Sequence, residues 1–363
     1  MHLKAIKRKG EEDSSMKRSR ILACCMLGLC ALTGFGSDGT VLHIYTWSDY
    51  IAKDVVARFE KENGCKVAIA TFDSNEAMFA KLQKDGTSGY DIIMPSSYQI
   101  PAMIENGMVQ PLDHAKLPNV RRNFDATYGV SILDPSFMYN VPYAVTYSGI
   151  AYRKDKVGNA PIDSWNVFGT AALKGRMSLL SDMRETLGAG LMALGYSIIS
   201  TRKEQIAAAA DKVIEWKRNI AKFDNERYKE AVASGEWAVG HGYSSDVIQV
   251  MLKGDDIGFA LPKEGFTIAF DEIVIAAGSK NVDLAHKFIN FCYDPDVAAA
   301  NMAEVCSLMP VGAAISKLDG RLRKLVELDA HTLRRGEVIR DFYDRPEIGK
   351  MYSDAWDRVM VAE

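Results

Sequence analysis

The alternation of strand-like and helix-like segments in residues 41–94 constrains the fold more than any other feature of the sequence. Residues 41–45, 66–71 and 90–94 have the apolar character of strands. The two segments between them carry apolar residues at helical spacing. This β-α-β-α-β order favours right-handed crossovers and predicts a mostly parallel sheet. Because ligands of such sheets bind beyond the carboxyl ends of strands, we expect the loops after residues 45 and 94 to form part of a site.

The remaining sequence predicts a second α/β lobe. Strand-like segments at residues 176–180 and 237–240 flank a helical segment at residues 203–219. A buried strand at residues 268–276 follows, with helices at 284–293 and 296–305. A chain of 363 residues is too long for one ordinary core. We therefore expect two lobes, joined by more than one crossing strand, with a ligand cleft at the hinge.

The first 36 residues have the layout of an export signal. A basic segment at residues 17–20 precedes an apolar run at residues 21–32, and small residues follow. The apolar run is about a dozen residues, shorter than the roughly 20 that span a bilayer as a helix. We therefore predict a cleaved signal at residues 1–36, with translation starting at Met1 or at Met16.

The cysteines fall into two groups. The predicted signal contains Cys24, Cys25 and Cys30. Two interpretations of these cysteines remain open, lipid attachment at a Leu-x-x-Cys pattern or a purely apolar role within the signal. The other three cysteines are Cys65, Cys292 and Cys306. Because they are dispersed and odd in number, we predict that they are buried free thiols.

The net charge and the positions of the histidines argue against nucleic-acid binding, metal binding and catalysis as functions. Removal of residues 1–36 takes away seven basic and three acidic residues, so the net charge changes from −3 to −7. An acidic chain argues against nucleic acid as a partner and permits a cationic ligand. The histidines are scattered, so no metal site, cofactor site or nucleophile–base pair is predicted.

Several motifs, in order along the chain, resemble the bacterial periplasmic spermidine/putrescine-binding proteins. The first is Tyr45-Thr46-Trp47-Ser48-Asp49-Tyr50, and further matches lie at residues 72–76, 90–98, 182–185 and 235–246. The likeness continues at residues 262–265, at Asp271, and at residues 288–291 and 294–298, so that it covers nearly all of residues 40–345. Their joint order and spacing, rather than any single motif, carry the resemblance.

The resemblance implies an α/β, two-lobed periplasmic-binding-protein fold of type II, with lobe 1 at residues 37–146 plus 272–314 and lobe 2 at residues 147–271 plus 315–363. It also implies a monomer in the periplasm that captures a polyamine and delivers it to the permease of an ABC importer. Contact with a membrane is then expected only through a lipid anchor.

Matched position by position, the resemblance implies eleven ligand-binding residues, namely Trp47, Ser48, Asp49, Tyr50, Ser96, Tyr98, Asp182, Glu185, Tyr243, Asp246 and Asp271. These residue types suit a protonated amine, because aromatic faces attract cations and carboxylates form charge-assisted hydrogen bonds with ammonium groups. A four-carbon diamine spans roughly 6 Å between its nitrogens. We expect Asp271 to bind one end, and Asp246, Asp182 or Glu185 the other.

Three positions depart from the family pattern. Ala269 stands in place of an aromatic wall, for which Phe270 could partly compensate, and Ser307 and Ile339 stand where a tyrosine and a glutamine are usual. These departures favour putrescine over the longer spermidine.

Other interpretations remain open at this point. The same lobes could bind another cationic or amino-acid-like solute, which the three departures motivate. An enzyme on this fold is disfavoured by the export signal and by the lack of a nucleophile–base pair, and an adhesin would leave the cleft residues unexplained. Without the family, Trp47 and Tyr50 are typical of rim or core aromatics, and Asp182 and Glu185 of a solvated helix face.

Overall fold

The computed structural model describes residues 39–363, except 129–135, 255, 341, 343–344 and 363. Residues Gly39–Glu363 form one compact unit. The predicted export signal, with Met16 and its cysteines, lies outside the described residues. In the described part, no helix is long and apolar enough to cross a membrane.

The strands form a central sheet whose order is β2-β1-β3-β10-β5-β8-β6-β7. Three further strands lie off this path, with β4 and β11 beside β10 and β9 beside β5. The strands are β1 (Val41–Thr46), β2 (Lys66–Thr71), β3 (Ile92–Ile93), β4 (Val109–Gln110), β5 (Asn140–Arg153), β6 (Met177–Leu179), β7 (Lys222–Phe223), β8 (Val239–Tyr243), β9 (Ile257–Ala260), β10 (Phe266–Ala276) and β11 (Gly336–Val338).

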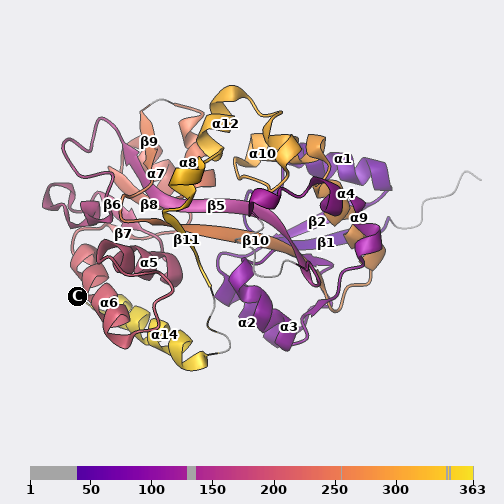
Figure 1. Ribbon diagram of the computed structural model, residues 1–363, viewed down its shortest axis with the longest axis horizontal. Coiled ribbons are helices and arrows are strands. Elements are labelled where there is room, and N and C mark those ends of the chain that lie inside the picture. The colour runs from indigo at the N-terminus through magenta and orange to yellow at the C-terminus, as the bar shows by residue number, and fades with distance from the viewer. Residues whose placement is uncertain (1–38, 129–135, 255, 341, 343–344, 363) are drawn as a thin grey trace, which may run out of the picture. The chain divides into compact units, whose positions relative to one another are not determined.

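The sheet is mixed rather than mostly parallel, which corrects that part of the sequence prediction. β1 pairs in parallel with β2 and β3, and β6 pairs in parallel with β7 and β8. The long strands β5 and β10 pair antiparallel with each other and lie side by side across the middle of the sheet (Figure 1). A β-α-β pattern reports only the crossover units, so it does not reveal two long strands that join one group of parallel strands to the other.

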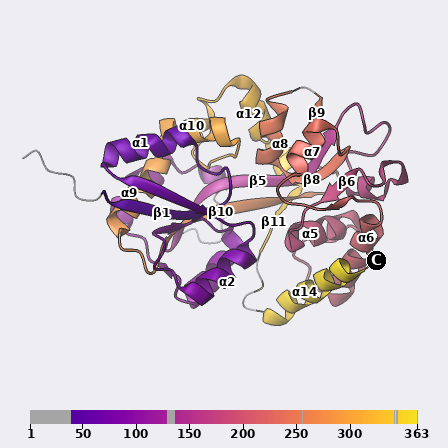
Figure 2. The same cartoon turned by 180° about the vertical axis from the view of Figure 1, so that it is seen from behind.

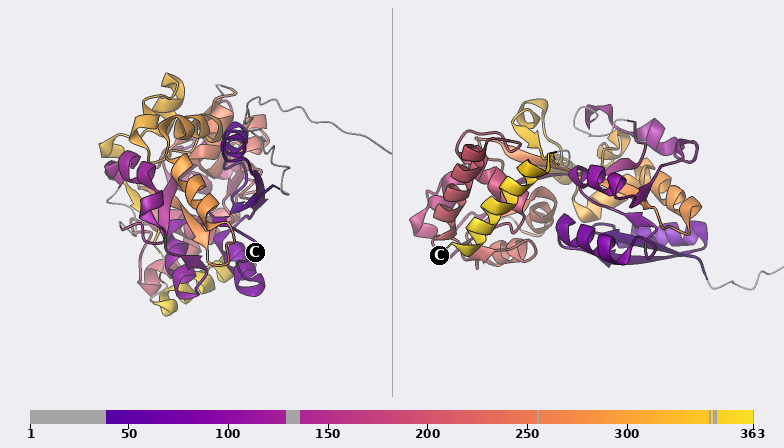
Figure 3. Two further views of the ribbon diagram at one scale, coloured as in Figure 1. Left: turned by 90° about the vertical axis from the view of Figure 1, so that its right-hand side faces the viewer. Right: turned by 90° about the horizontal axis from the view of Figure 1, so that it is seen from below.

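Helices cover both groups of parallel strands. Figures 1 and 2 show α5 and α6 beside β6 and β8, with α14 packed against α5 and α6, and α1 and α9 beside β1. In the right-hand view of Figure 3, the yellow helix α14 lies in a different group from the indigo elements of the N-terminal part. The helices are α1 (Lys53–Asn63), α2 (Asn75–Asp85), α3 (Ile100–Glu105), α4 (Pro118–Asn123), α5 (Met183–Ala193), α6 (Lys203–Lys217), α7 (Tyr228–Ser234), α8 (Ser244–Met251), α9 (Val282–Cys292), α10 (Pro295–Val305), α11 (Gly312–Ile315), α12 (Gly320–Val326), α13 (Ala330–Leu333) and α14 (Pro346–Val361).

Local sequence signals explain where several helices begin and end. The Ser74 side chain accepts a hydrogen bond from the backbone N–H of Ala77 and caps α2, as its position in the sequence predicts. Gly64 ends α1 in the left-handed conformation, with φ of 60°, which glycine adopts without a Cβ clash. The Asp294 side chain caps α10 directly before Pro295, a residue suited to the first helical turn.

The apolar residues form several buried clusters. The cluster around β1, β10, α9 and α10 contains Phe59, Phe270 and Phe288, and the cluster around β6, α5 and α6 contains Trp165 and Trp216. Trp216 is fully buried. Cys65, Cys292 and Cys306 are buried free thiols, which confirms the sequence prediction for them.

Candidate ligand-binding site

A cavity in the compact unit brings together all eleven residues that the family resemblance implies. They come from the loops after β1 and β3, from the start of α5, from the junction of β8 with α8, and from β10. The residues are Trp47, Ser48, Asp49, Tyr50, Ser96, Tyr98, Asp182, Glu185, Tyr243, Asp246 and Asp271. Segments more than 200 positions apart in the sequence thus line one cavity.

Asp271 is positioned by an irregularity in β10. The pairing of β10 with β5 shifts register between Asp271 and Glu272, and Asp271 also forms an isolated bridge with Ser96. Such β-bulges re-aim a side chain out of the regular alternation. The Ser96 hydroxyl donates to Asp271 Oδ1 at 2.7 Å, and the Tyr50 hydroxyl donates to Asp271 Oδ2.

Burial disfavours the ionised form of Asp271 and raises its pKa to about 6, although the two hydroxyl donors act in the opposite direction. Both of its partners are neutral, and no ion pair to Asp271 is found within the described residues. A cation placed beside Asp271 would therefore provide the countercharge that this carboxylate lacks.

The loop after β1 presents Trp47 and Asp49 to the cavity. Asp49 has a φ of 52°, a left-handed conformation that aspartate adopts more readily than most residues. The Trp47 ring packs on Phe72 with ring centroids 4.4 Å apart, which leaves the indole half-buried. The loop after β1 therefore holds one carboxylate and one aromatic surface at the cavity.

Tyr98 and Ser96 are held by one buried amide. Asn75 Nδ2 donates to the Tyr98 hydroxyl at 2.7 Å, and Asn75 Oδ1 accepts from the Ser96 backbone N–H at 3.1 Å. Asn75 is the first residue of α2, so this helix positions two cavity residues from the loop after β3. The Ser96 side chain forms no helix cap, and its hydroxyl donates to Asp271 instead.

A second group of carboxylates lies at the start of α5. Asp182 caps this helix by accepting from the backbone N–H of Glu185 at 3.0 Å, and the Tyr243 hydroxyl donates weakly to Asp182 at 3.4 Å. Glu185 is buried and accepts a hydrogen bond from Thr267. Burial, followed by the charge of Asp182, raises the Glu185 pKa to about 7. The interpretation of these acids as a solvated helix face is therefore wrong for Glu185.

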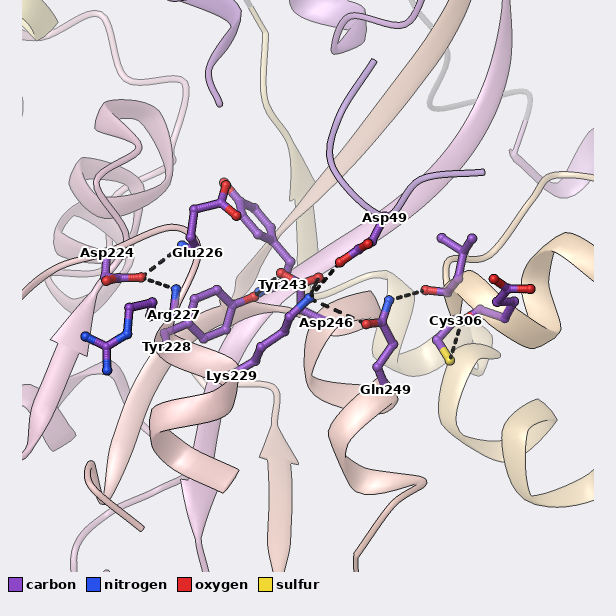
Figure 4. Close-up of polar contacts among 12 residues, drawn as sticks. Asp49, Asp224, Glu226, Arg227, Tyr228, Lys229, Tyr243, Asp246, Gln249 and Cys306 are labelled. Atoms are coloured by element: carbon purple, nitrogen blue, oxygen red, sulfur yellow. Dashed lines mark hydrogen bonds and ion pairs between the residues drawn. The ribbon is translucent and has the colours of Figure 1, made fainter. Parts of the chain in front are cut away.

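Asp246 anchors a third part of the cavity. The Tyr228 hydroxyl donates to Asp246 Oδ2 at 2.7 Å and also accepts from the Tyr243 backbone N–H at 2.9 Å. Tyr228 thereby positions both the acid and the neighbouring aromatic residue. Asp246 differs from Asp271 because its other oxygen lies 3.4 Å from the Lys229 ammonium, so it already has a charged partner (Figure 4).

Several cavity-lining residues were not selected from the sequence. Besides Ala269 and Ile339, they are Asp73, Thr146, Asn225, Glu226, Lys229, Ser245, Gln249 and Val305. Asp73 lies within a matched motif, which could have identified it. Lys229 and Gln249 lie on helices whose local patterns give no indication of a cavity.

The three departures from the family pattern have different positions. Ala269 and Ile339 line the cavity. Phe270 is 1% exposed within the core, because successive residues of a strand point to opposite faces, so it does not replace the missing aromatic wall. Ser307 is buried and is not part of the cavity lining. The cavity therefore has one small aliphatic wall at Ala269.

The comparisons with known proteins agree with this geometry. Residues 54–319 match the family of bacterial extracellular solute-binding proteins. The chain is a bacterial extracellular solute-binding protein. A putrescine/cadaverine-binding protein of Pseudomonas aeruginosa is 34% identical over 91% of this chain and 96% of its own length. The putrescine-binding periplasmic protein PotF of Escherichia coli is 33% identical over 89% of this chain and 92% of its own length.

A solved structure shares the fold. A protein of Listeria monocytogenes assigned to a spermidine/putrescine ABC transporter superposes with a TM-score of 0.83 at 33% identity, covering 89% of this chain and all of the other. The two-lobed fold of periplasmic binding proteins that the sequence predicted is thereby confirmed. Membership of this family also agrees with the expectation of a binding component rather than an enzyme.

The charged residues that line the cavity in this solute-binding protein are mostly acidic. Among the described lining residues there are seven carboxylates and one lysine. The carboxylates are Asp49, Asp73, Asp182, Glu185, Glu226, Asp246 and Asp271. Four aromatic side chains, Trp47, Tyr50, Tyr98 and Tyr243, line the same space. Acids beside aromatic faces suit an organic cation with an apolar body.

Proposed function

We propose that this solute-binding protein captures a small polyamine, putrescine or spermidine, outside the cytoplasm and delivers it to an ABC importer. The observation that carries the proposal is Asp271, a buried carboxylate that faces the cavity and whose hydrogen-bond partners, among the described residues, are two hydroxyl groups. Ionising such a group in the empty protein is costly, and an ammonium group would remove that cost. The relatives named for putrescine binding support the same ligand class.

One ammonium would bind Asp271, with the methylene chain along the aromatic residues. The second ammonium would bind among Asp182, Glu185 and Asp246. A charge-assisted hydrogen bond adds roughly 1.5–3 kcal/mol, and a cation over an aromatic face about 0.5–2 kcal/mol. Aromatic and acidic residues therefore recognise different parts of the same molecule.

Ligand capture would couple to lobe closure. We infer lobe 1 at residues 37–146 plus 272–314 and lobe 2 at residues 147–271 plus 315–363, with crossings in β5, in β10 and at residues 314–315. In this scheme Trp47 belongs to lobe 1 and Asp271 to lobe 2, so a ligand that contacts both would favour the closed state. The permease would then distinguish loaded from empty protein by shape.

The cellular location and assembly complete the proposal. Relatives named as periplasmic support export of this chain, with residues 1–36 as the cleaved signal. We infer a monomer, attached to a membrane only if Cys30 or a neighbouring cysteine is lipidated. Metabolic labelling with a fatty acid, compared between the wild type and Cys30→Ser, tests that attachment.

A second candidate ligand is another cationic or amino-acid-like solute. The small wall at Ala269, with Phe270 facing the core, motivates this candidate. Ligands with a bulkier body than a polyamine would use the space beside Ala269 that an aromatic side chain would otherwise fill.

Isothermal titration of the ligand-free protein tests the function. We expect micromolar or tighter binding of putrescine or spermidine and no binding of 1,4-butanediol, which has the same chain length without charge. If neither amine binds while another solute raises the melting temperature in a ligand panel, the polyamine assignment is wrong.

A further inference from the structure

Lys229 is a cation built into an otherwise acidic cavity. It is the second residue of α7 and lines the cavity, and its side chain is only 13% exposed. Figure 4 shows its ammonium directed between Asp49 and Asp246. The Lys229 Nζ atom lies 3.7 Å from Asp49 Oδ2 and 3.4 Å from Asp246 Oδ1.

The surroundings of Lys229 hold its ammonium at this place. Gln249 Oε1 is 3.5 Å from Nζ, and the same amide is oriented by donating from Nε2 to the Val305 carbonyl at 3.0 Å. The nearby carboxylates raise the Lys229 pKa despite the opposing effect of burial, so the side chain stays charged at neutral pH. A carboxylate pair with an ammonium between its members is the arrangement that a ligand ammonium would also require.

The two acidic ends of the cavity therefore differ. Asp271 has neutral hydroxyl partners, whereas Asp246 has a hydroxyl partner on one oxygen and the Lys229 ammonium at the other. A ligand ammonium that approaches Asp246 meets the positive charge of Lys229, and must displace it or share the carboxylate with it. An uncharged hydroxyl at the same place carries no such penalty and can accept a hydrogen bond from the lysine.

We propose that Lys229 is a specificity-determining residue, whose tethered ammonium occupies the Asp49–Asp246 end of the cavity and weakens the preference for a diamine over a monoamine of equal length. This inference rests on the proposed amine-binding function and refines it. The ligand class favoured by Lys229 has one ammonium for Asp271 and a neutral polar group at the far end.

The test compares two ligands that differ only at the far end, putrescine and 4-amino-1-butanol, by isothermal titration of the full chain. The measured quantity is the ratio of their dissociation constants. In Lys229→Met and in Lys229→Gln, we expect this ratio to shift at least tenfold in favour of putrescine. Lys229→Arg keeps the charge and is expected to keep the wild-type ratio.

Lys212→Met is the matched control. Lys212 is also a partly buried lysine paired with a carboxylate, Glu215 at 3.0 Å, but it does not line the cavity. The Lys212→Met substitution removes the same charge as Lys229→Met, and it should leave the ratio of the two dissociation constants unchanged. Thermal unfolding verifies that each variant is folded.

The outcomes separate the inference from the function on which it rests. If putrescine binds and the ratio is the same in the wild type and both neutral Lys229 variants, the inference is wrong and the proposed function stands. If folded wild type and variants bind none of putrescine, 4-amino-1-butanol and spermidine, the proposed function fails, and the inference fails with it.

Discussion

Replacing Asp271 by asparagine should weaken ligand binding and, at the same time, stabilise the empty protein. Asp271 is 7% exposed, and its pKa is raised from 3.8 to about 6, chiefly by burial. Each pKa unit corresponds to about 1.4 kcal/mol, so ionisation of Asp271 costs the empty folded protein about 3 kcal/mol at pH 7.5. Asparagine removes this cost while retaining an oxygen that can accept from Tyr50 or Ser96.

The sign of the pH dependence follows from the raised pKa. Below the unfolded value of 3.8 the carboxyl is protonated in both states and has no ionisation cost. The cost grows as the pH rises through 3.8 toward about 6, and it is fully present above that value. Asp271→Asn should therefore raise the free energy of unfolding by about 1–3 kcal/mol at pH 7.5, after some loss of hydrogen bonding, and by less than about 1 kcal/mol at pH 4.

The same substitution should lower the affinity for the ligand, whereas it raises the free energy of unfolding of the empty protein. Loss of one charge-assisted contact of about 1.5–3 kcal/mol predicts a roughly 10- to 200-fold weaker affinity for putrescine. Urea unfolding of the ligand-free protein at both pH values measures the first effect, and isothermal titration measures the second. Asp354→Asn is the control, because Asp354 is an exposed carboxylate of α14 paired with Lys350.

Two results would refute this reasoning. If Asp271→Asn lowers the free energy of unfolding equally at pH 7.5 and pH 4, burial does not penalise the carboxylate. If the affinity for putrescine is unchanged, Asp271 does not bind the ligand.

Three further measurements test other parts of the site and core. Because the pKa is about 6 at Asp271 and about 7 at Glu185, an amine should displace protons, and its affinity should fall about tenfold or more between pH 7 and pH 5. Isothermal titration in two buffers of different ionisation enthalpy would measure the number of protons that the amine displaces. An affinity that does not change with pH would contradict the assignment of Asp271 and Glu185 as amine-binding residues. Trp47→Ala should weaken amine binding by roughly 2- to 30-fold through the lost aromatic face, and an unchanged dissociation constant would exclude Trp47 as a wall. Trp216→Ala should lower the free energy of unfolding by about 3–5 kcal/mol, because the side chain is fully buried, while the amine affinity of the folded protein stays the same.

Agreement between sequence and structure is best where a short stretch of chain contains its own signal. The bounds of β2 are those expected, and the start of α2 follows from the Ser74 cap. β3 is shorter than expected, since only Ile92–Ile93 keep the ladder hydrogen bonds. The length of β5 was not foreseen, because a strand that begins at Asn140 and ends at Arg153 draws its stability from pairing with distant strands.

The sequence by itself determined the α/β class, the two-lobed family and the residues expected at the cavity, because periodicity, caps and ordered motifs are properties of neighbouring residues. Only the tertiary structure decided that Asp271 has neutral partners while Asp246 faces Lys229, and that Phe270 turns away from the wall at Ala269. These features depend on contacts between segments far apart in the chain and on which face of a strand each side chain takes. The electrostatic environment of a buried group is a property of the folded arrangement, so the sequence could supply the charges of the site but not their pairing.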